Sequence, residues 1–405
     1  MRRRFLWRYY GFQFFFNLLL WLPVYYDFQK RIGLNDAQIF GIQTIYYLAF
    51  CVLEIPTGHL ADRWGHRSCM KLGAIVLVVA NLVPVFALSY WGMLGHFLLI
   101  SVARSLISGA ASAYLYDYLR LNPDIGDYKQ TEGAARAYGL GGKVVFWAGI
   151  GALMEWHLTL PYLLTALSAF ISLLFAWGLP PLGDEEHRAR PGFFAELKPL
   201  LGLLRGSPRL VLLMLQGLSI FVLARICQVN LFQPILTEKG FSVATFGMIL
   251  ALNTVFEAVG SAYPHWLRRW LSDEHAVSLL TFVLGGCLSL TALSGRVGSV
   301  VWLSVFALAV GLAYPIQRQL LNDAIPEARY RATFLSVESL IDRVACAAVA
   351  AVIGGYVALH RLDQFLHLSN LVCSSLTAVV AGLLLMDARS ARRIEPGLGD
   401  EGTGA

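Results

Sequence analysis

The chain has 405 residues, of which 57% are hydrophobic and only 14% are charged, and its mean hydropathy is +0.59. Soluble proteins carry about 25% charged residues, so this composition excludes an ordinary soluble domain and indicates an integral membrane protein. The net charge of +6 comes from basic residues that lie between apolar runs, which argues against a nucleic-acid-binding protein.

Apolar runs predict twelve membrane-spanning helices, and the N-terminal run is the first of them. A spanning helix needs about 20 apolar residues. The N-terminal run is too long for a signal peptide and lacks a small-residue cleavage site. We therefore predict an all-α integral membrane protein. Its spans are expected at 9–27, 37–58, 72–90, 92–117, 136–156, 160–179, 209–232, 244–266, 275–295, 298–320, 333–358 and 365–387.

The distribution of Lys and Arg predicts that both termini are cytoplasmic. With that orientation, twenty-two Lys and Arg residues fall in inner segments. Outer segments then hold only five, which are Lys30, Arg31, Lys239, Arg296 and Arg361. Such a positive-inside bias is typical of multi-pass proteins. We expect a monomer in the cell membrane, with the lipid bilayer as its surroundings.

The twelve spans divide into two halves of nearly equal length. We predict an N-terminal six-helix bundle at 1–179 and a C-terminal six-helix bundle at 209–388. A polar cytoplasmic linker, 180–208, joins them and contains a segment amphipathic enough to lie on the inner leaflet. The tail 389–405 is polar and glycine-rich, and we expect it to be disordered. Two parallel six-helix repeats are typical of transporters.

We expect a short polar turn to join the second and third spans, and this segment contains a dense motif. From Gly58 to Arg67 the sequence reads G-H-L-A-D-R-W-G-H-R, with Asp62, Arg63 and Gly65 at fixed offsets. The segment resembles the signature of the major facilitator superfamily, G-x-L-a-D-R-x-G-R-R, and departs from it only at His66. The resemblance implies the twelve-helix fold of that family, with two pseudo-symmetric bundles, and secondary transport by alternating access.

The resemblance also implies a conformational latch at the cytoplasmic face. In the family, the Asp of the motif faces the start of span eleven, and its Arg pairs with an acid at the end of span four. Here Asp62 would face 331–333 and Arg67 would pair with Asp117. Such a latch would stabilise the outward-open state. The alternative is that Asp62 and Arg67 only cap helices at the membrane surface.

Several polar side chains inside the spans are candidates for a substrate cavity. Arg104 lies near the middle of the fourth span, where a charge costs about 2.5–3.5 kcal/mol on insertion scales. It either serves function or is satisfied structurally by backbone carbonyls. In the first span we place Gln13 and Asn17 at the cavity and Tyr25 in an interfacial aromatic belt. The full set of cavity candidates is Gln13, Asn17, Trp21, Arg104, Lys143, Arg225 and Gln228.

Acidic residues inside the spans are candidates for proton coupling, because an acid there can take up and release a proton during transport. They are Glu54, Glu257, Glu338 and Asp342. Glu54 could instead brace the nearby motif, and Glu257 could be structural.

The sequence contains no nucleotide-binding motif, catalytic constellation or metal-ligand cluster, so we predict a non-enzyme without cofactor or metal. An ion gradient, most simply of protons, would drive transport. One hypothesis is efflux of a small amphipathic or drug-like molecule. The alternative is uptake of a small anionic metabolite, bound by Arg104, Lys143, Arg225 and Arg343. A non-transporting receptor or enzyme on the same fold is a third possibility.

Overall fold

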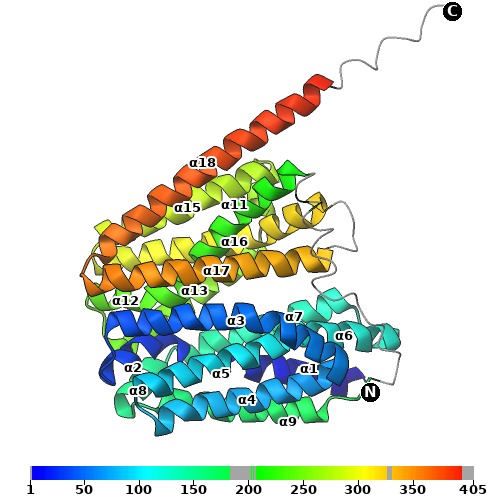
Figure 1. Cartoon of the computed structure of the whole chain (residues 1–405), viewed down its shortest axis with the longest axis vertical. Coiled ribbons are helices and arrows are strands. Elements are labelled where there is room, and N and C mark those ends of the chain that lie inside the picture. The colour runs from blue at the N-terminus through cyan, green and yellow to red at the C-terminus, as the bar shows by residue number, and fades with distance from the viewer. Residues whose placement is uncertain (1, 183–201, 203, 205–206, 326–330, 395–405) are drawn as a thin grey trace, which may run out of the picture.

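The computed structural model describes residues 2–182, 202, 204, 207–325 and 331–394, and within these residues all regular structure is helical. The first bundle of helices lies along one side of the molecule, below the second in Figure 1. Its elements are α1 (Arg2–Asn17), η1 (Leu22–Val24), α2 (Tyr25–Arg31), α3 (Asp36–Trp64), α4 (His66–Phe86), α5 (Tyr90–Ser108), α6 (Ala110–Leu121), η2 (Pro123–Ile125), α7 (Tyr128–Trp147), α8 (Ile150–Trp156) and α9 (Leu160–Gly178).

The second bundle lies above the first in Figure 1. Its elements are α11 (Pro208–Arg225), the π-helix η3 (Ile226–Leu231), α12 (Phe232–Glu238), α13 (Val243–Ala262), α14 (His265–Arg268), α15 (Asp273–Leu293), α16 (Arg296–Ala324), α17 (Arg331–Ala358) and α18 (Leu362–Ile394). The expected amphipathic segment of the linker lies outside the described residues. The first part of the expected disordered tail is wrong, because α18 continues to Ile394.

Ten helices in the described ranges are long and apolar enough to cross a membrane, or eleven when the bent pair α7 and α8 counts as one span. These eleven match eleven of the expected spans. The expected first span, 9–27, is wrong as a continuous helix. Helix α1 ends at Asn17, and the chain turns through η1 into the short helix α2.

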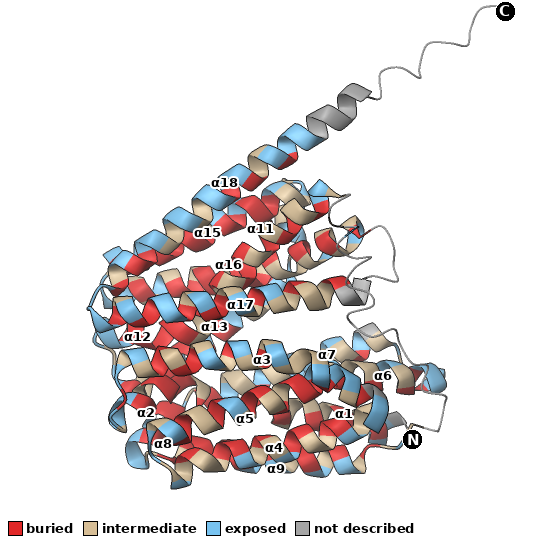
Figure 2. Cartoon of the chain, viewed as in Figure 1, coloured by how far each residue is buried: buried red, intermediate tan, exposed pale blue. Residues whose placement is uncertain are grey.

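Large apolar side chains cover the outside of the bundles. On α18, for example, Leu371 is 64% exposed and Met386 is 65% exposed, and Figure 2 shows how exposed positions follow the free side of this helix. In water such a surface would be unfavourable. In a bilayer the lipid tails are as apolar as these side chains, so the surface is the one that a membrane-embedded protein requires.

Helix α3 extends through most of the signature motif, which was expected to be a turn. Its 29 residues span roughly 43 Å at 1.5 Å per residue, whereas the hydrocarbon core is about 30 Å thick. The last turns of α3 therefore leave the hydrocarbon with their polar residues. Only Gly65 breaks the helix, and its φ of +82° is a conformation that glycine adopts without strain.

The two bundles meet closely through α7, α8 and α13. A Cβ atom added at Gly247 of α13 would lie 1.8 Å from the carbonyl oxygen of Trp147. One added at Gly151 of α8 would lie 2.0 Å from the carbonyl oxygen of Val243. Small residues at these positions let the helix backbones touch, as is usual where membrane helices pack.

We expect Gly247→Ala to destabilise the protein by about 1–3 kcal/mol, the usual range for overpacking a tight contact. The matched control is Gly286→Ala in α15, where an added Cβ meets no atom within 4 Å. Thermal melting of the purified variants measures the difference, with a lower Tm expected for Gly247→Ala only. Equal melting of the two variants would contradict a close contact at Gly247.

Candidate functional site

A cavity of 160 Å³, the central cavity, lies between the two bundles. Its side chains come from both bundles, namely from the end of α1 and the segment that follows it, from α3, α5 and α7, and from α11, η3 and α17. Six of the lining side chains are aromatic, namely Trp21, Tyr25, Tyr46, Tyr47, Phe97 and Trp147. The lining also contains two amide side chains and four basic side chains, namely Asn17, Gln43, Arg104, Lys143, Arg225 and Arg343.

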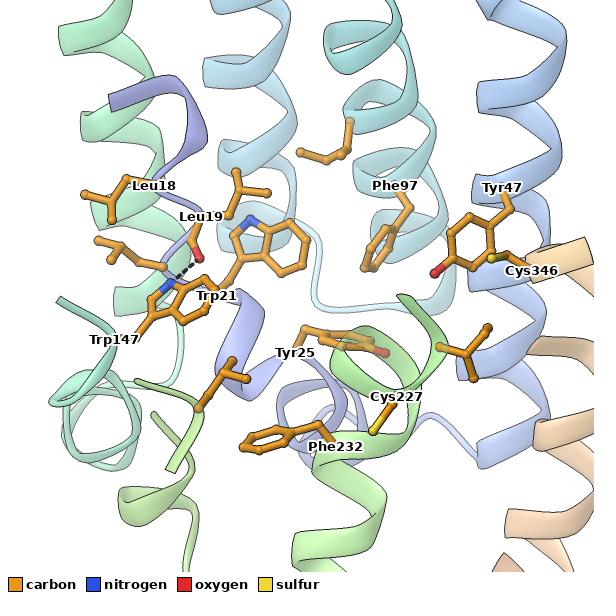
Figure 3. Packing of buried hydrophobic residues seen from close by; sticks show 14 of the residues in the cluster. Leu18, Leu19, Trp21, Tyr25, Tyr47, Phe97, Trp147, Cys227, Phe232 and Cys346 are labelled. Carbon is orange, nitrogen blue, oxygen red and sulfur yellow. Dashed lines mark hydrogen bonds between the residues drawn. The ribbon is translucent and has the colours of Figure 1, made fainter. Parts of the chain in front are cut away.

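The interruption of the first span borders this cavity. Unpaired backbone groups are costly at membrane depth, and side chains of neighbouring helices supply the missing partners. Trp147 donates its indole N–H to the carbonyl of Leu19 at 2.9 Å (Figure 3). The N–H of Leu20 donates to the hydroxyl of Thr165 at 3.0 Å. The break is therefore a stable feature, and it turns Trp21 toward the cavity.

Aromatic rings form one wall of the central cavity. Figure 3 shows Trp21, Tyr25, Phe97 and Tyr47 around this region. Trp21 and Phe97 meet edge to face, with ring centroids 5.5 Å apart. Tyr25 is 1% exposed and lines the cavity, so its expected place in an interfacial belt is wrong.

Positive charge dominates the lining of the central cavity. Arg225 is neutralised by Asp342, whose Oδ2 accepts hydrogen bonds of 3.1 and 2.8 Å from it. Arg104, Lys143 and Arg343 have no carboxylate within 4 Å among the described side chains. Lys143 instead lies over the ring of Trp147, 5.3 Å from its centroid.

Gln43 is a cavity residue that the sequence analysis missed. It is fully buried in α3, and both atoms of its amide lack a hydrogen-bond partner in the described part of the chain. The available signal was a glutamine inside the apolar run of the second span. Tyr46 and Tyr47 were missed for the opposite reason, because aromatic residues are common throughout this sequence.

None of the four acidic candidates lines the central cavity. Glu338, 2% exposed, accepts a 2.5 Å hydrogen bond from Arg318. Glu257 accepts a 2.8 Å hydrogen bond from Gln228.

Other candidates also lie away from the lining. Gln228 was expected at the cavity, but the lining contains Val229 instead. Gln13 is likewise absent from the lining and bonds to Asn17, which is present. Glu54 is half-buried on α3, and its Oε2 has no described partner.

The signature motif makes contacts that differ from the expected latch. Arg67 does not pair with Asp117 and instead donates to the carbonyl of Trp177 at 2.9 Å. Nε2 of His66 lies 3.6 Å from the carboxylate of Asp117. His66 is the one position at which the motif departs from the family pattern, and it lies beside Asp117, the expected partner of Arg67. The side chains of Asp62 and of 331–333 lie outside the described part.

Hydrogen bonds between the bundles gather toward the end that carries α2, α8 and α12, opposite the two chain termini (Figure 1). We call this the closed end. There Tyr25 donates to the carbonyl of Val229 at 2.9 Å, and Tyr47 donates to Oδ1 of Asn230 at 2.8 Å. Gln233 accepts from the N–H of Tyr26 and donates to the carbonyl of Leu22, each at 2.9 Å.

These features define a class of protein, a multi-pass membrane protein with a binding cavity between two helical bundles, which is the architecture of a solute transporter. The family model of the Major Facilitator Superfamily matches residues 8–349. The chain therefore belongs to the Major Facilitator Superfamily, as the signature motif indicated.

Solved structures of transporters share the fold. The crystal structure of the nucleoside transporter NupG is 14% identical, with a TM-score of 0.74, and the match covers 95% of this chain and 99% of that one. A POT family transporter in complex with a thioalcohol-conjugated peptide is 13% identical, with a TM-score of 0.70 and coverages of 96% and 95%.

A curated relative is the uncharacterized transporter BU466 of Buchnera aphidicola subsp. Acyrthosiphon pisum (strain APS). It is 26% identical over 106 residues, which is 26% of each chain. The match thus spans about a quarter of that relative. Family and fold together identify a membrane transporter.

We expect Gln233→Leu to loosen the closed end, because the substitution removes two hydrogen bonds between the bundles. At about 1 kcal/mol each, their loss shifts the opening equilibrium by roughly 30-fold. The measurement is the rate of maleimide labelling of Cys227 in a background without the other cysteines. Cys227 is 3% exposed and lies in the irregular helix at 226–231 that accepts hydrogen bonds from the first bundle at the closed end.

The control for this prediction is Gln29→Leu. Gln29 is also fully buried, but its amide donates to Tyr25 within the same bundle. Labelling should remain slow in this variant. Equal labelling rates in the two variants would mean that Gln233 does not hold the bundles together.

Proposed function

We propose that this protein is a secondary transporter that binds a small organic anion in the central cavity. The observation that carries the proposal is the excess of positive charge, with Arg104, Lys143 and Arg343 in a lining that has no described carboxylate. Arg225 adds no net charge because Asp342 neutralises it.

Desolvation explains why an anion fits this site. A cation removed from water is unfavourable unless an opposite charge or several acceptors surround it. A carboxylate or phosphate entering between Arg104 and Lys143 supplies that charge, and guanidinium groups bind both anions through paired hydrogen bonds. The same cations would repel a cationic amphipathic compound. The arrangement therefore favours an anionic metabolite over a cationic drug-like molecule as the substrate.

The aromatic wall gives the substrate a second requirement. Trp21, Tyr25 and Phe97 offer apolar ring surface on one side of the cavity, so a purely inorganic ion would leave that surface without a partner. An organic anion, with a carbon skeleton against the rings and its charge against the cations, uses both parts of the lining.

The proposed orientation places both termini in the cytoplasm, as the distribution of Lys and Arg predicts. The closed end then faces outward, and the cavity exchanges with the cytoplasmic side. The alternate state would open the closed end and engage the signature motif as a latch near Asp62. We propose that the transporter works as a monomer in the cell membrane.

We further propose that protons drive transport. Glu257 supports this part of the proposal, because it lies on α13, the helix that packs against α7 and its Lys143. Its only described hydrogen bond is to the neutral amide of Gln228. Glu54 remains a second candidate. Glu338 and Asp342 are each held by an arginine.

The test of anion binding is Arg104→Gln in purified protein, with levulinate and 3-benzoylpropionate as probes. Loss of a charge-assisted hydrogen bond costs about 1.5–3 kcal/mol, so calorimetry should show Kd rising about 10- to 150-fold. Arg209→Gln is the control, because Arg209 pairs with Glu274 at the surface. Levulinamide, the neutral analogue, should not bind. Unchanged affinity in Arg104→Gln would refute the anion site.

The test of coupling is Glu257→Gln in proteoliposomes. Levulinate uptake driven by an imposed pH gradient should disappear, since the amide cannot carry a proton. Exchange of labelled for unlabelled levulinate at equal pH should persist, because the site itself is intact. Gradient-driven uptake at the wild-type rate would exclude Glu257 as the coupling residue.

A further inference from the structure

The two amides of the central cavity, Asn17 and Gln43, have hydrogen-bonding atoms for which the proposed anion site gives no role. Gln43 is fully buried, and its Nε2 and Oε1 both lack a partner among the described residues. Buried amides in proteins are almost always hydrogen-bonded. Because Gln43 lines the cavity, its amide is available to bind a ligand in the cavity.

A chain of hydrogen bonds fixes which atom Asn17 offers to the cavity. The hydroxyl of Tyr9 faces two acceptors, the carboxylate of Glu132 at 3.0 Å and the carbonyl of Ala111 at 3.4 Å. A carboxylate oxygen and a carbonyl oxygen both accept hydrogen bonds, so the single hydroxyl proton of Tyr9 points toward these two acceptors. The Tyr9 oxygen is then available to accept from Nε2 of Gln13, at 2.9 Å.

The same chain continues to Asn17. Because the Nε2 of Gln13 donates to Tyr9, its side-chain oxygen faces Asn17. This oxygen accepts a hydrogen bond from Nδ2 of Asn17 at 3.1 Å. The Gln13 carbonyl accepts from the same nitrogen at 2.9 Å. Asn17 therefore keeps its nitrogen turned along α1, and its Oδ1, which accepts no hydrogen bond from any described residue, is an acceptor for a ligand in the cavity.

We propose that the substrate is an organic anion that also carries an amide, such as an N-acylated amino acid. Its negative group binds Arg104 and Lys143, its N–H donates to Oδ1 of Asn17, and its carbonyl accepts from Nε2 of Gln43. The proposal rests on the proposed anion site and assigns Asn17 and Gln43 as specificity-determining residues. Glu132, Tyr9 and Gln13 position Asn17 without contacting the substrate.

Two matched pairs of probes test the assignment. N-acetylglycine and levulinate have the same charge and nearly the same shape, but a methylene in levulinate replaces the N–H. N-benzoylglycine and 3-benzoylpropionate form the same pair with an aromatic ring. A site with an acceptor for the N–H discriminates against the analogue that lacks it, so wild-type protein should bind each amide at least roughly tenfold more tightly.

The variants separate the two roles. In Asn17→Leu, the affinity ratio within each pair should fall to about one, because the acceptor for the N–H is lost. In Gln43→Leu, both members of each pair should bind more weakly by a similar factor, because both keep the carbonyl. Asn81→Leu is the control, since Asn81 is a fully buried amide of α4 outside the cavity lining, and its ratio should match wild type.

The outcomes distinguish this inference from the anion site. Equal binding of amide and ketone by the wild-type protein, with Arg104→Gln weakening both, overturns the amide assignment and leaves the anion site standing. Failure of all four anions to bind overturns the anion site, and the amide assignment with it. A wild-type preference that survives in Asn17→Leu excludes Asn17 as its source, and melting curves of each variant confirm that it is folded.

Discussion

Backbone groups inside a membrane need hydrogen-bond partners from the protein itself, and this constraint governs the interrupted first span. The chain leaves the helix after Asn17, and partners come from Trp147, Thr165 and Gln233, which lie on three other helices. One of them, Gln233, belongs to the second bundle. The hydrogen bonds to the backbone of this break thus also join the bundles, and the break places Trp21 and Tyr25 at the cavity.

The seventh span, which occupies the corresponding position in the second bundle, is also irregular. Its π-helix η3 contains Val229 and Asn230, which accept hydrogen bonds from Tyr25 and Tyr47. π-Helical turns within α-helices are frequently found at functional sites. Two irregular segments therefore meet at the closed end, where these side-chain hydrogen bonds join the two bundles.

Much of the fold could be predicted because hydrophobic length is a local property. Eleven of the expected spans have matching helices, and the Gly58–Arg67 motif identified the family. The first span was misjudged because apolar composition continues through the break, whereas the break depends on partners distant in sequence. Among the cavity candidates, Asn17, Trp21, Arg104, Lys143 and Arg225 do line the cavity, since polar groups within apolar spans are rarely placed without a partner or a role.

The sequence alone determined the class, the number and order of nearly all spans, and the presence of cations at membrane depth. The tertiary structure decided which of those cations are neutralised, because an ion pair such as Arg225–Asp342 joins residues 117 positions apart. It likewise decided that the amide of Gln43 has no partner among the described residues and that His66 lies 3.6 Å from the carboxylate of Asp117. Composition and spacing follow from the chain itself, but pairing depends on how separate helices pack, and the charge left over in the cavity is a result of that packing.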